Sequence, residues 1–243
     1  FGFEAGTNKT DFNNYDNNAG IKGNPQKFDR LKTNSAFYYV SQHFAIKNTF
    51  YIDASLSLQQ MKYGWKTTFP NVENGNKAFK NQLFPNIALS YKITPSFSLR
   101  GKVSKGNSSP TTEEIRSSNR MIAQDLVPEF GWNKEIGIRK KIGSIFIETT
   151  LFHYQLKDAI VKRQDQEGND YFINAGGTKQ LGLEFTVESQ NYTFEHSVLN
   201  QLHFLVSGNL YDFKYDAYQV NNVSYTNHQL PGISKFSMQS LIN

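Results

Sequence analysis

Apolar and polar side chains alternate along this chain with a period of two. In residues 97–104 the odd positions are apolar or small and the even positions are polar, and residues 50–59 and 181–188 alternate in the same way. Such alternation gives a β-strand one apolar face and one polar face. Helix-period stretches are nearly absent. Only residues 111–121, with Thr112 as a candidate N-cap, are expected to form a short helical turn.

The alternating segments divide the chain into about ten predicted strands, joined by connections of alternating length. Short connections lie at 46–49, 94–96 and 140–144, and only the connection at 189–201 departs from this scheme. The predicted strands are residues 1–5, 36–45, 50–63, 84–93, 97–105, 130–142, 145–161, 171–188, 202–212 and 232–242. The predicted long polar loops are residues 6–35, 64–83, 106–129, 162–170 and 213–231.

Two-faced strands with alternately long and short connections are typical of an outer-membrane β-barrel, whose closed sheet leaves no backbone group unpaired in lipid. A soluble sandwich or propeller also has alternating strands, but sandwich strands are usually about five or six residues long. Segments 50–63, 145–161 and 171–188 are far longer. No run of about 18 uncharged apolar residues exists, so no transmembrane helix is expected. The sequence predicts an all-β fold, an antiparallel transmembrane barrel.

Charged residues in the middle of predicted strands favour the barrel, because a wide barrel turns them toward a wet lumen and the alternate residues toward lipid. In residues 181–188 we expect the odd positions to face lipid and the even positions to face the lumen. Glu135 and Arg139 lie four apart on one strand face and are expected to join an interior ion-pair network. The mid-strand charged residues are Asp53, Arg100, Lys102, Arg139, Glu148, Glu184 and Glu188.

Composition narrows the class of protein further. The chain has 243 residues and is 38% hydrophobic, but 14% of its residues are aromatic, which excludes a disordered chain. It has no cysteine, so disulfides, thiolate metal sites and cysteine nucleophiles are excluded. The net charge of +5 is mild and unclustered, so nucleic acid is not an expected partner. Because the sequence opens on Phe1 without a signal segment, we expect it to begin within a longer protein.

Six segments carry motifs that occur together, and in the same order, in one known family. The most specific is Leu126-Val127-Pro128-Glu129 followed by Asn133-Lys134-Glu135-Ile136-Gly137-Ile138-Arg139. The six segments are 83–91, 97–115, 126–139, 152–160, 171–184 and 230–233. Over residues 83–188 the chain resembles the barrel domain of TonB-dependent outer-membrane receptors. Ahead of Leu83 the likeness is architectural only.

The resemblance implies a place for this chain within a larger receptor. Family members have a barrel of twenty-two strands, an N-terminal plug domain inside it, and a TonB box that the energy transducer grips. We therefore expect residues 1–243 to form part of the barrel domain, about ten of its strands, without the plug and the last strands. Ten such strands would leave two open edges. The expected location is the bacterial outer membrane, and the expected partners are the TonB complex (through the absent plug), lipid and lipopolysaccharide.

The implied function is active import of a scarce nutrient, usually a ferric siderophore and less often haem, cobalamin or an oligosaccharide. Cations on the long loops would attract an anionic ferric chelate, and Arg binds carboxylates bidentately, so ferric citrate or a carboxylate siderophore would suit. The alternative is that these cations are solvated or contact lipopolysaccharide. The candidate ligand-binding residues are Arg116, Arg120, Arg100, Lys162 and Arg163.

Other function classes find less support in the sequence. A barrel hydrolase would need a serine and a histidine in a distinctive arrangement, and no nucleophile elbow or metal pair occurs, so the chain is not expected to be an enzyme and no cofactor is expected. A passive channel remains open as an alternative. A haem receptor is the nearer rival, because His228 in a predicted outer loop is a candidate axial ligand. The histidines are His43, His153, His196, His203 and His228.

Overall fold

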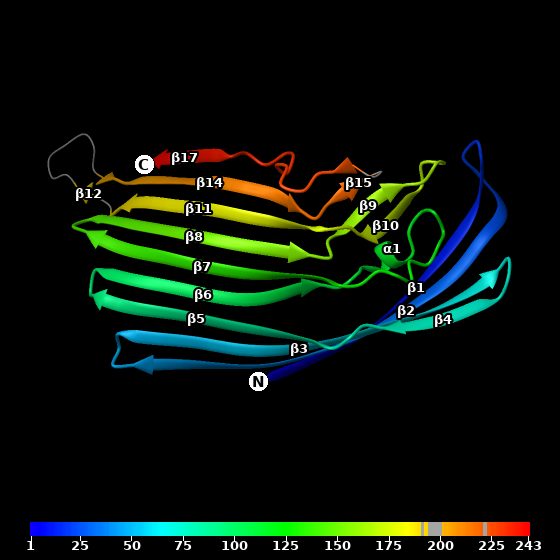
Figure 1. Cartoon of the computed structure of the whole chain (residues 1–243), viewed down its shortest axis with the longest axis horizontal. Coiled ribbons are helices and arrows are strands. Elements are labelled where there is room, and N and C mark those ends of the chain that lie inside the picture. The colour runs from blue at the N-terminus through cyan, green and yellow to red at the C-terminus, as the bar shows by residue number, and fades with distance from the viewer. Residues whose placement is uncertain (191, 194–200, 221–222) are drawn as a thin grey trace.

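The chain forms a long, curved antiparallel sheet in the computed structural model, which describes residues 1–190, 192–193, 201–220 and 223–243 (Figure 1). Neighbouring strands are joined alternately by tight turns and by longer connections. The main strands are β1 (Gly2–Asn18), β2 (Ile21–Ile46), β3 (Phe50–Phe69), β5 (Gln82–Thr94), β6 (Phe97–Ser108), β7 (Glu129–Ile142), β8 (Ile145–Lys157), β11 (Gly177–Ser189), β14 (Phe204–Asp216) and β17 (Phe236–Ile242).

One short helix and several short strands lie in the connections at the ends of the sheet. The single helix of the described residues is α1 (Thr112–Ile115), and β4 (Glu73–Ala78) pairs with the end of β3. The other short strands are β9 (Ile160–Gln164), β10 (Asp170–Asn174), β12 (Tyr192–Thr193), β13 (Gln201–Leu202), β15 (Gln219–Val220) and β16 (Val223–Ser224). Among the residues that the structure describes, no helix is long and apolar enough to cross a membrane.

Within the described residues the main strands follow chain order across one eleven-stranded sheet, β1-β2-β3-β5-β6-β7-β8-β11-β14-β17, with β4 beside β3. Successive strands therefore reverse direction, and the connections gather at two ends (Figure 1). One end, here named the turn end, carries the short connections 47–49, 95–96 and 143–144. The other, the loop end, carries the connections 70–81, 109–128, 158–176 and 217–235. The sheet's outermost strands are β1 and β17.

The prediction of a long loop at 6–35 is wrong, because β1 and β2 form a continuous hairpin there, joined at Ala19 and Gly20. Both turn residues have positive φ, 53° and 89°, which suits a two-residue hairpin turn. The predicted loop 64–83 is also largely strand, since β3 continues to Phe69 and pairs with β4. These strands are rich in Asn, Lys and Thr, so they lack the apolar face by which the other strands were recognised.

Several other predicted boundaries shift. The predicted strand 145–161 ends at Lys157, and the predicted strand 171–188 is two strands, β10 and β11, divided near Gly176 with its φ of 64°. The predicted strand 202–212 extends to Asp216, and 232–242 begins its pairing at Phe236. The irregular connection at 189–201 falls largely outside the described residues. The helical turn is present, but its N-cap is Thr111 and not Thr112. Thr111 lies three residues before Glu114, the spacing that closes a capping box.

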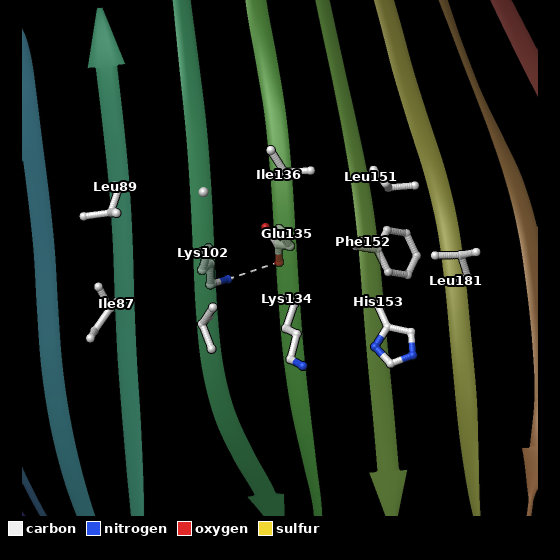
Figure 2. Close-up of a pocket in the computed structure, with 12 residues that line it drawn as sticks. Ile87, Leu89, Lys102, Lys134, Glu135, Ile136, Leu151, Phe152, His153 and Leu181 are labelled. Carbon is white, nitrogen blue, oxygen red and sulfur yellow. Dashed lines mark hydrogen bonds and ion pairs between the residues drawn. The ribbon is translucent and has the colours of Figure 1, made fainter.

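The sheet has two chemically different faces, as the alternation predicted. Directly paired residues share a face, and alternate residues along a strand point to opposite faces. Figure 2 shows Ile136 and Leu151 on one side of the ribbons and the Lys102–Glu135 pair on the other. The apolar face carries Ile87, Leu89, Val103, Ile136, Leu151 and Leu181. The polar face carries Asp53, Ser90, Arg100, Glu135, Glu148 and Thr150.

Buried side chains gather at the loop end, on the polar face of the first strands. Leu31 of β2, Tyr63 of β3, Phe79 and Ile115 of α1 form one cluster, with exposed fractions of at most 8%. Ile115 belongs to the 109–128 connection, which joins β6 to β7 at the loop end (Figure 1) and packs against β2 and β3. The loop end is thus a small folded core attached to an otherwise single-layered sheet.

Candidate functional site: the polar face and the loop end

The middle of the polar face carries an ion-pair network that spans three strands. Arg100 of β6 lies 2.8 Å from Glu148 of β8, and Arg139 of β7 lies 3.9 Å from the same carboxylate. Lys102 reaches Glu135 at 3.4 Å across the β6–β7 pair. The predicted interior network of Glu135 and Arg139 is therefore present, with each residue paired to a neighbouring strand and not to the other. Arg100 and Glu148 are about two fifths exposed, and both lie on the polar face of the sheet.

Arg116, the first of the predicted ligand-binding residues, is buried at the loop end. Its Nε lies 2.6 Å from Asp29 Oδ2 of β2, and the two side chains are only 2% and 0% exposed. A second guanidinium nitrogen donates to Asn14 Oδ1 of β1 at 2.6 Å, and the Phe12 ring lies 5.3 Å away. Thr67 donates to the other Asp29 oxygen at 2.6 Å. Arg116 thus joins the 109–128 loop to the first three strands, and in this arrangement its guanidinium does not face solvent.

Arg120 reinforces the same attachment. Its guanidinium donates to the Gln26 side chain of β2, and its carbonyl accepts from Lys27 Nζ at 2.6 Å. Its φ of 64° is unusual for a residue with a side chain and turns the loop sharply toward β2. Arg120 is half-buried, so part of its side chain remains accessible at the loop end.

Lys162 and Arg163 lie on the β9–β10 hairpin, which forms the neighbouring part of the loop end. Lys162 Nζ is 3.4 Å from Asp170 Oδ2, and its side chain is more than half exposed. Arg163 lies over the Tyr218 ring at 5.3 Å and donates to the Gln219 carbonyl at 3.4 Å. These two cations are consecutive residues of β9, so their side chains leave opposite faces of the hairpin and contact different partners. Arg116 and Arg120 bond instead to β1 and β2.

The 109–128 loop is also bonded to this second hairpin. Asn174 of β10 receives the Val127 N–H at 2.8 Å and donates to the Val127 carbonyl at 2.9 Å. Ser118 and Asn119 bond to the Asp170 backbone. A cleft of about 530 Å³ separates the loop from β10, lined by residues that include Asn119, Asp125 and Asn174. The 109–128 loop is therefore hydrogen-bonded to β2 on one side and to β10 on the other.

Two charged groups at the loop end have shifted pKa values. Burial lowers the pKa of Lys77 on β4, and the nearby Asp125 carboxylate opposes that shift. Lys77 donates to the Leu126 carbonyl at 2.8 Å, so it too holds the 109–128 loop. The pKa of Asp165, in the β9–β10 turn, is lowered: desolvation raises it, but hydrogen bonds from Asn169, Glu167 and Gly168 outweigh that effect.

A run of aromatic rings lies along the polar face of β14 and was not predicted from the sequence. Tyr211 and Phe213 stack at 4.7 Å, and Phe152 of β8 packs edge-on against both. Farther toward the loop end Tyr215 stacks on Tyr218 at 4.5 Å. The only available signal was the alternation at 211, 213 and 215, which shows the shared face but not the neighbour on β8.

The histidines are dispersed. His43 pairs with Asp53 at 2.6 Å near the turn end, and His203 with Glu188 at 3.2 Å. His228 packs edge-on against Tyr225 in the connection between β14 and β17. His196 lies outside the described residues. Among the described residues, no three of His, Asp and Glu gather in a way that would hold a metal ion.

A long antiparallel sheet with one broadly exposed apolar face and one charged face is typical of the wall of a transmembrane β-barrel. The family model described as "TonB dependent receptor-like, beta-barrel" matches residues 1–241. The chain therefore belongs to this family of outer-membrane β-barrels. A comparison with curated protein sequences finds no match.

Solved structures of the same architecture resemble the chain. The ferric citrate transporter in its unliganded form superposes with a TM-score of 0.66 at 15% identity, over 90% of this chain and 31% of that one. The ferric yersiniabactin uptake receptor of Yersinia pestis gives 0.64 at 17% identity, over 90% and 33%. The ferripyoverdine receptor of Pseudomonas aeruginosa gives 0.62 at 11%, over 91% and 27%. The chain spans about a third of the length of these receptors.

Proposed function

We propose that this chain is part of the barrel wall of a receptor that imports a ferric siderophore or a similar iron chelate by TonB-dependent active transport. The observation that carries the proposal is the match of the barrel family to residues 1–241. The polar face and its Arg100–Glu148–Arg139 network support it, because a charged wall suits a wet interior. The similar receptors for ferric citrate and ferric yersiniabactin favour an iron chelate as the class of ligand.

In this proposal residues 1–243 all belong to the barrel domain. The outermost strands β1 and β17 would pair with further strands of the receptor, since an open sheet edge is not tolerated in lipid. The loop end would face the outside of the cell, because outer-membrane barrels carry their longer loops there. The apolar face would meet lipid, and the polar face would meet the interior.

We propose different roles for the five candidate cations. We propose that Lys162 and Arg163 meet an anionic chelate from the β9–β10 hairpin at the loop end, Lys162 through its largely exposed side chain and Arg163 from the hairpin's other face, beside Tyr218. Arg120 and Arg100 would contribute charge from the 109–128 loop and from the wall. For Arg116, ligand contact stays a prediction. Its burial against Asp29 favours a positioning role, in which it holds the loop over the polar face.

An uptake experiment tests the proposed function. Cells that carry the intact receptor are offered radiolabelled ferric citrate, a ferric catecholate and haem, with and without a working TonB complex. The proposal predicts TonB-dependent accumulation of iron from a chelate, and weaker accumulation with Lys162→Glu and Arg163→Glu together. Uptake that continues without TonB would indicate a passive channel, and uptake of haem alone would support the rival ligand.

A further inference from the structure

Cations occupy the apolar face of the sheet near the loop end. The residues that pair across β7, β8, β11 and β14 can be followed row by row. One row is wholly apolar: Ile136, Leu151, Leu183 and Leu210. The next row toward the loop end is Lys134, His153, Leu181 and Asp212, and the row after it is Trp132, Gln155, Lys179 and Lys214. The last row includes Phe130, Lys157 and Asp216.

These residues share the face of the exposed leucines and not that of the ion-pair network. Figure 2 shows Lys134 and His153 on the same side of the ribbons as Leu151 and Leu181. The change from apolar to charged residues is abrupt, and the charged rows extend over about 13 Å, since two residues of a strand rise about 6.7 Å. We name Lys134, Lys157, Lys179 and Lys214 the cationic belt.

The belt carries more positive than negative charge. Lys179 lies 2.9 Å from Asp216, and Lys214 lies 2.7 Å from Asp212, so two of the four lysines are compensated on the same face. Within the described part of the chain, Lys134 and Lys157 are exposed and make no ion pair within 4 Å, although Lys157 also attracts Asp216, which lies in its row and already pairs with Lys179. Lys157 lies opposite Phe130 across the β7–β8 pair, and Lys134 lies opposite His153 and two residues from Ile136 on the same face of β7.

An anionic group can therefore bind beside Lys134 and Lys157, next to the exposed apolar residues of the same face. A lysine offers a phosphate a compact positive charge with three donors. The apolar row beneath the belt is broadly exposed, with Ile136 at 61%, Leu210 at 48% and Leu151 at 45%. The partner that combines phosphates with several acyl chains on the outer side of this membrane is the lipid A part of lipopolysaccharide.

We propose that the cationic belt binds the phosphates of lipid A, through Lys134 and Lys157, while the apolar rows below it contact the acyl chains. The belt then fixes the height of the wall in the outer leaflet. This inference rests on the proposed placement of the loop end at the cell exterior. It concerns the lipid-facing surface, so iron uptake and lipid binding are separate readouts.

In the test, the purified intact receptor is titrated in detergent with bis-phosphorylated lipid A. The unaltered receptor is compared with a double variant that carries both Lys134→Gln and Lys157→Gln. Each lysine near an anionic lipid surface contributes roughly fivefold, so the double variant should bind about 25-fold more weakly. Fully dephosphorylated lipid A should bind both proteins equally. Lys140→Gln is the matched control, because Lys140 lies on the same face at the turn end, over Phe97.

Equal affinity of the two proteins for bis-phosphorylated lipid A would overturn the proposal, as would equally tight binding of phosphatidylglycerol. The charge-preserving pair Lys134→Arg and Lys157→Arg should retain binding. If the double Gln variant does not fold, the unaltered receptor still decides: salt must weaken its binding of the phosphorylated lipid and spare the dephosphorylated one. If the unaltered receptor takes up iron normally but binds phosphorylated and dephosphorylated lipid A equally, the proposed lipid site is refuted and the proposed function is not.

Discussion

Two isoleucines show how differently the two regions of this molecule are built. Ile115, in the 109–128 loop, has no exposed surface, and it packs with Leu31, Tyr63 and Phe79 as in a soluble domain. Ile136, in the wall, is 61% exposed and packs on a single layer of strands. The loop end buries its apolar residues within the protein, whereas the wall presents them to the membrane.

The same contrast holds for charge. Arg116 and Asp29 are removed from water and depend on each other, whereas Arg100 and Glu148 keep more than two fifths of their side-chain surface exposed. A buried charge that loses its partner is strongly destabilising, but an exposed pair contributes little. We therefore expect the wall to tolerate substitution of its charges and the buried Arg116–Asp29 pair of the loop end not to.

The largest expected effect follows from breaking the buried pair. Arg116→Met leaves Asp29 without a counter-charge, and we expect a loss of about 3–5 kcal/mol in the stability of the loop end. Arg100→Met in the wall should cost about 0–1 kcal/mol. Native-state proteolysis of the 109–128 loop measures the first, and unfolding of the whole receptor the second. Similar costs at both positions would refute the division into two regions.

A charge placed on the apolar face tests the wall itself. Leu183→Arg should cost about 2–4 kcal/mol if the position lies near the bilayer midplane, because Arg is costly in lipid. Thr186→Arg, three residues along β11 on the polar face, should be much milder. Refolding and unfolding titrations in lipid bilayers provide the measurement. Equal losses would mean that the faces are exchanged, as a one-residue shift in register would cause.

A smaller effect is expected at Gly182, which gives two rings room on the polar face. A Cβ there would lie 2.4 Å from the Phe152 ring and 2.9 Å from Tyr211, so Gly182→Ala must displace the aromatic stack. Overpacking of this kind costs about 1–3 kcal/mol. Gly106→Ala is the matched control, because nothing lies within 4 Å of its added Cβ. Near-ultraviolet circular dichroism should change in the first variant only, and an unchanged spectrum there would count against the stack.

Sequence reasoning predicted the wall well and the loop end poorly, for a physical reason. Strands in a membrane must alternate, so segments such as 97–105 and 130–142 were recognised nearly to their ends. The hairpin of β1 and β2 extends well past the apolar rows, and its residues there are mostly polar. Its strands are held by backbone pairing without an apolar face, so the sequence shows no alternation that would reveal them. This explains the missed strand pairing within residues 6–35.

The candidate site was limited by long-range contacts. Arg116 was selected because of its place on a long loop, but its partner Asp29 lies 87 residues away and is joined to it only by the fold. The Arg100–Glu148 contact likewise depends on a strand order that the charges alone do not reveal. Local signals were more dependable: the Thr111–Glu114 box could be located from its spacing, and the correct cap is one residue from the predicted one.

The central claim is that the loop end and the turn end lie on opposite sides of the outer membrane. The chain has no cysteine, so single cysteines can be placed at exposed positions of both ends. A membrane-impermeant maleimide should label Glu113→Cys and Glu167→Cys in intact cells, and Thr49→Cys and Pro95→Cys only after the membrane is opened. Labelling of Thr49→Cys in intact cells while Glu113→Cys stays protected would contradict the orientation and, with it, the proposed receptor wall.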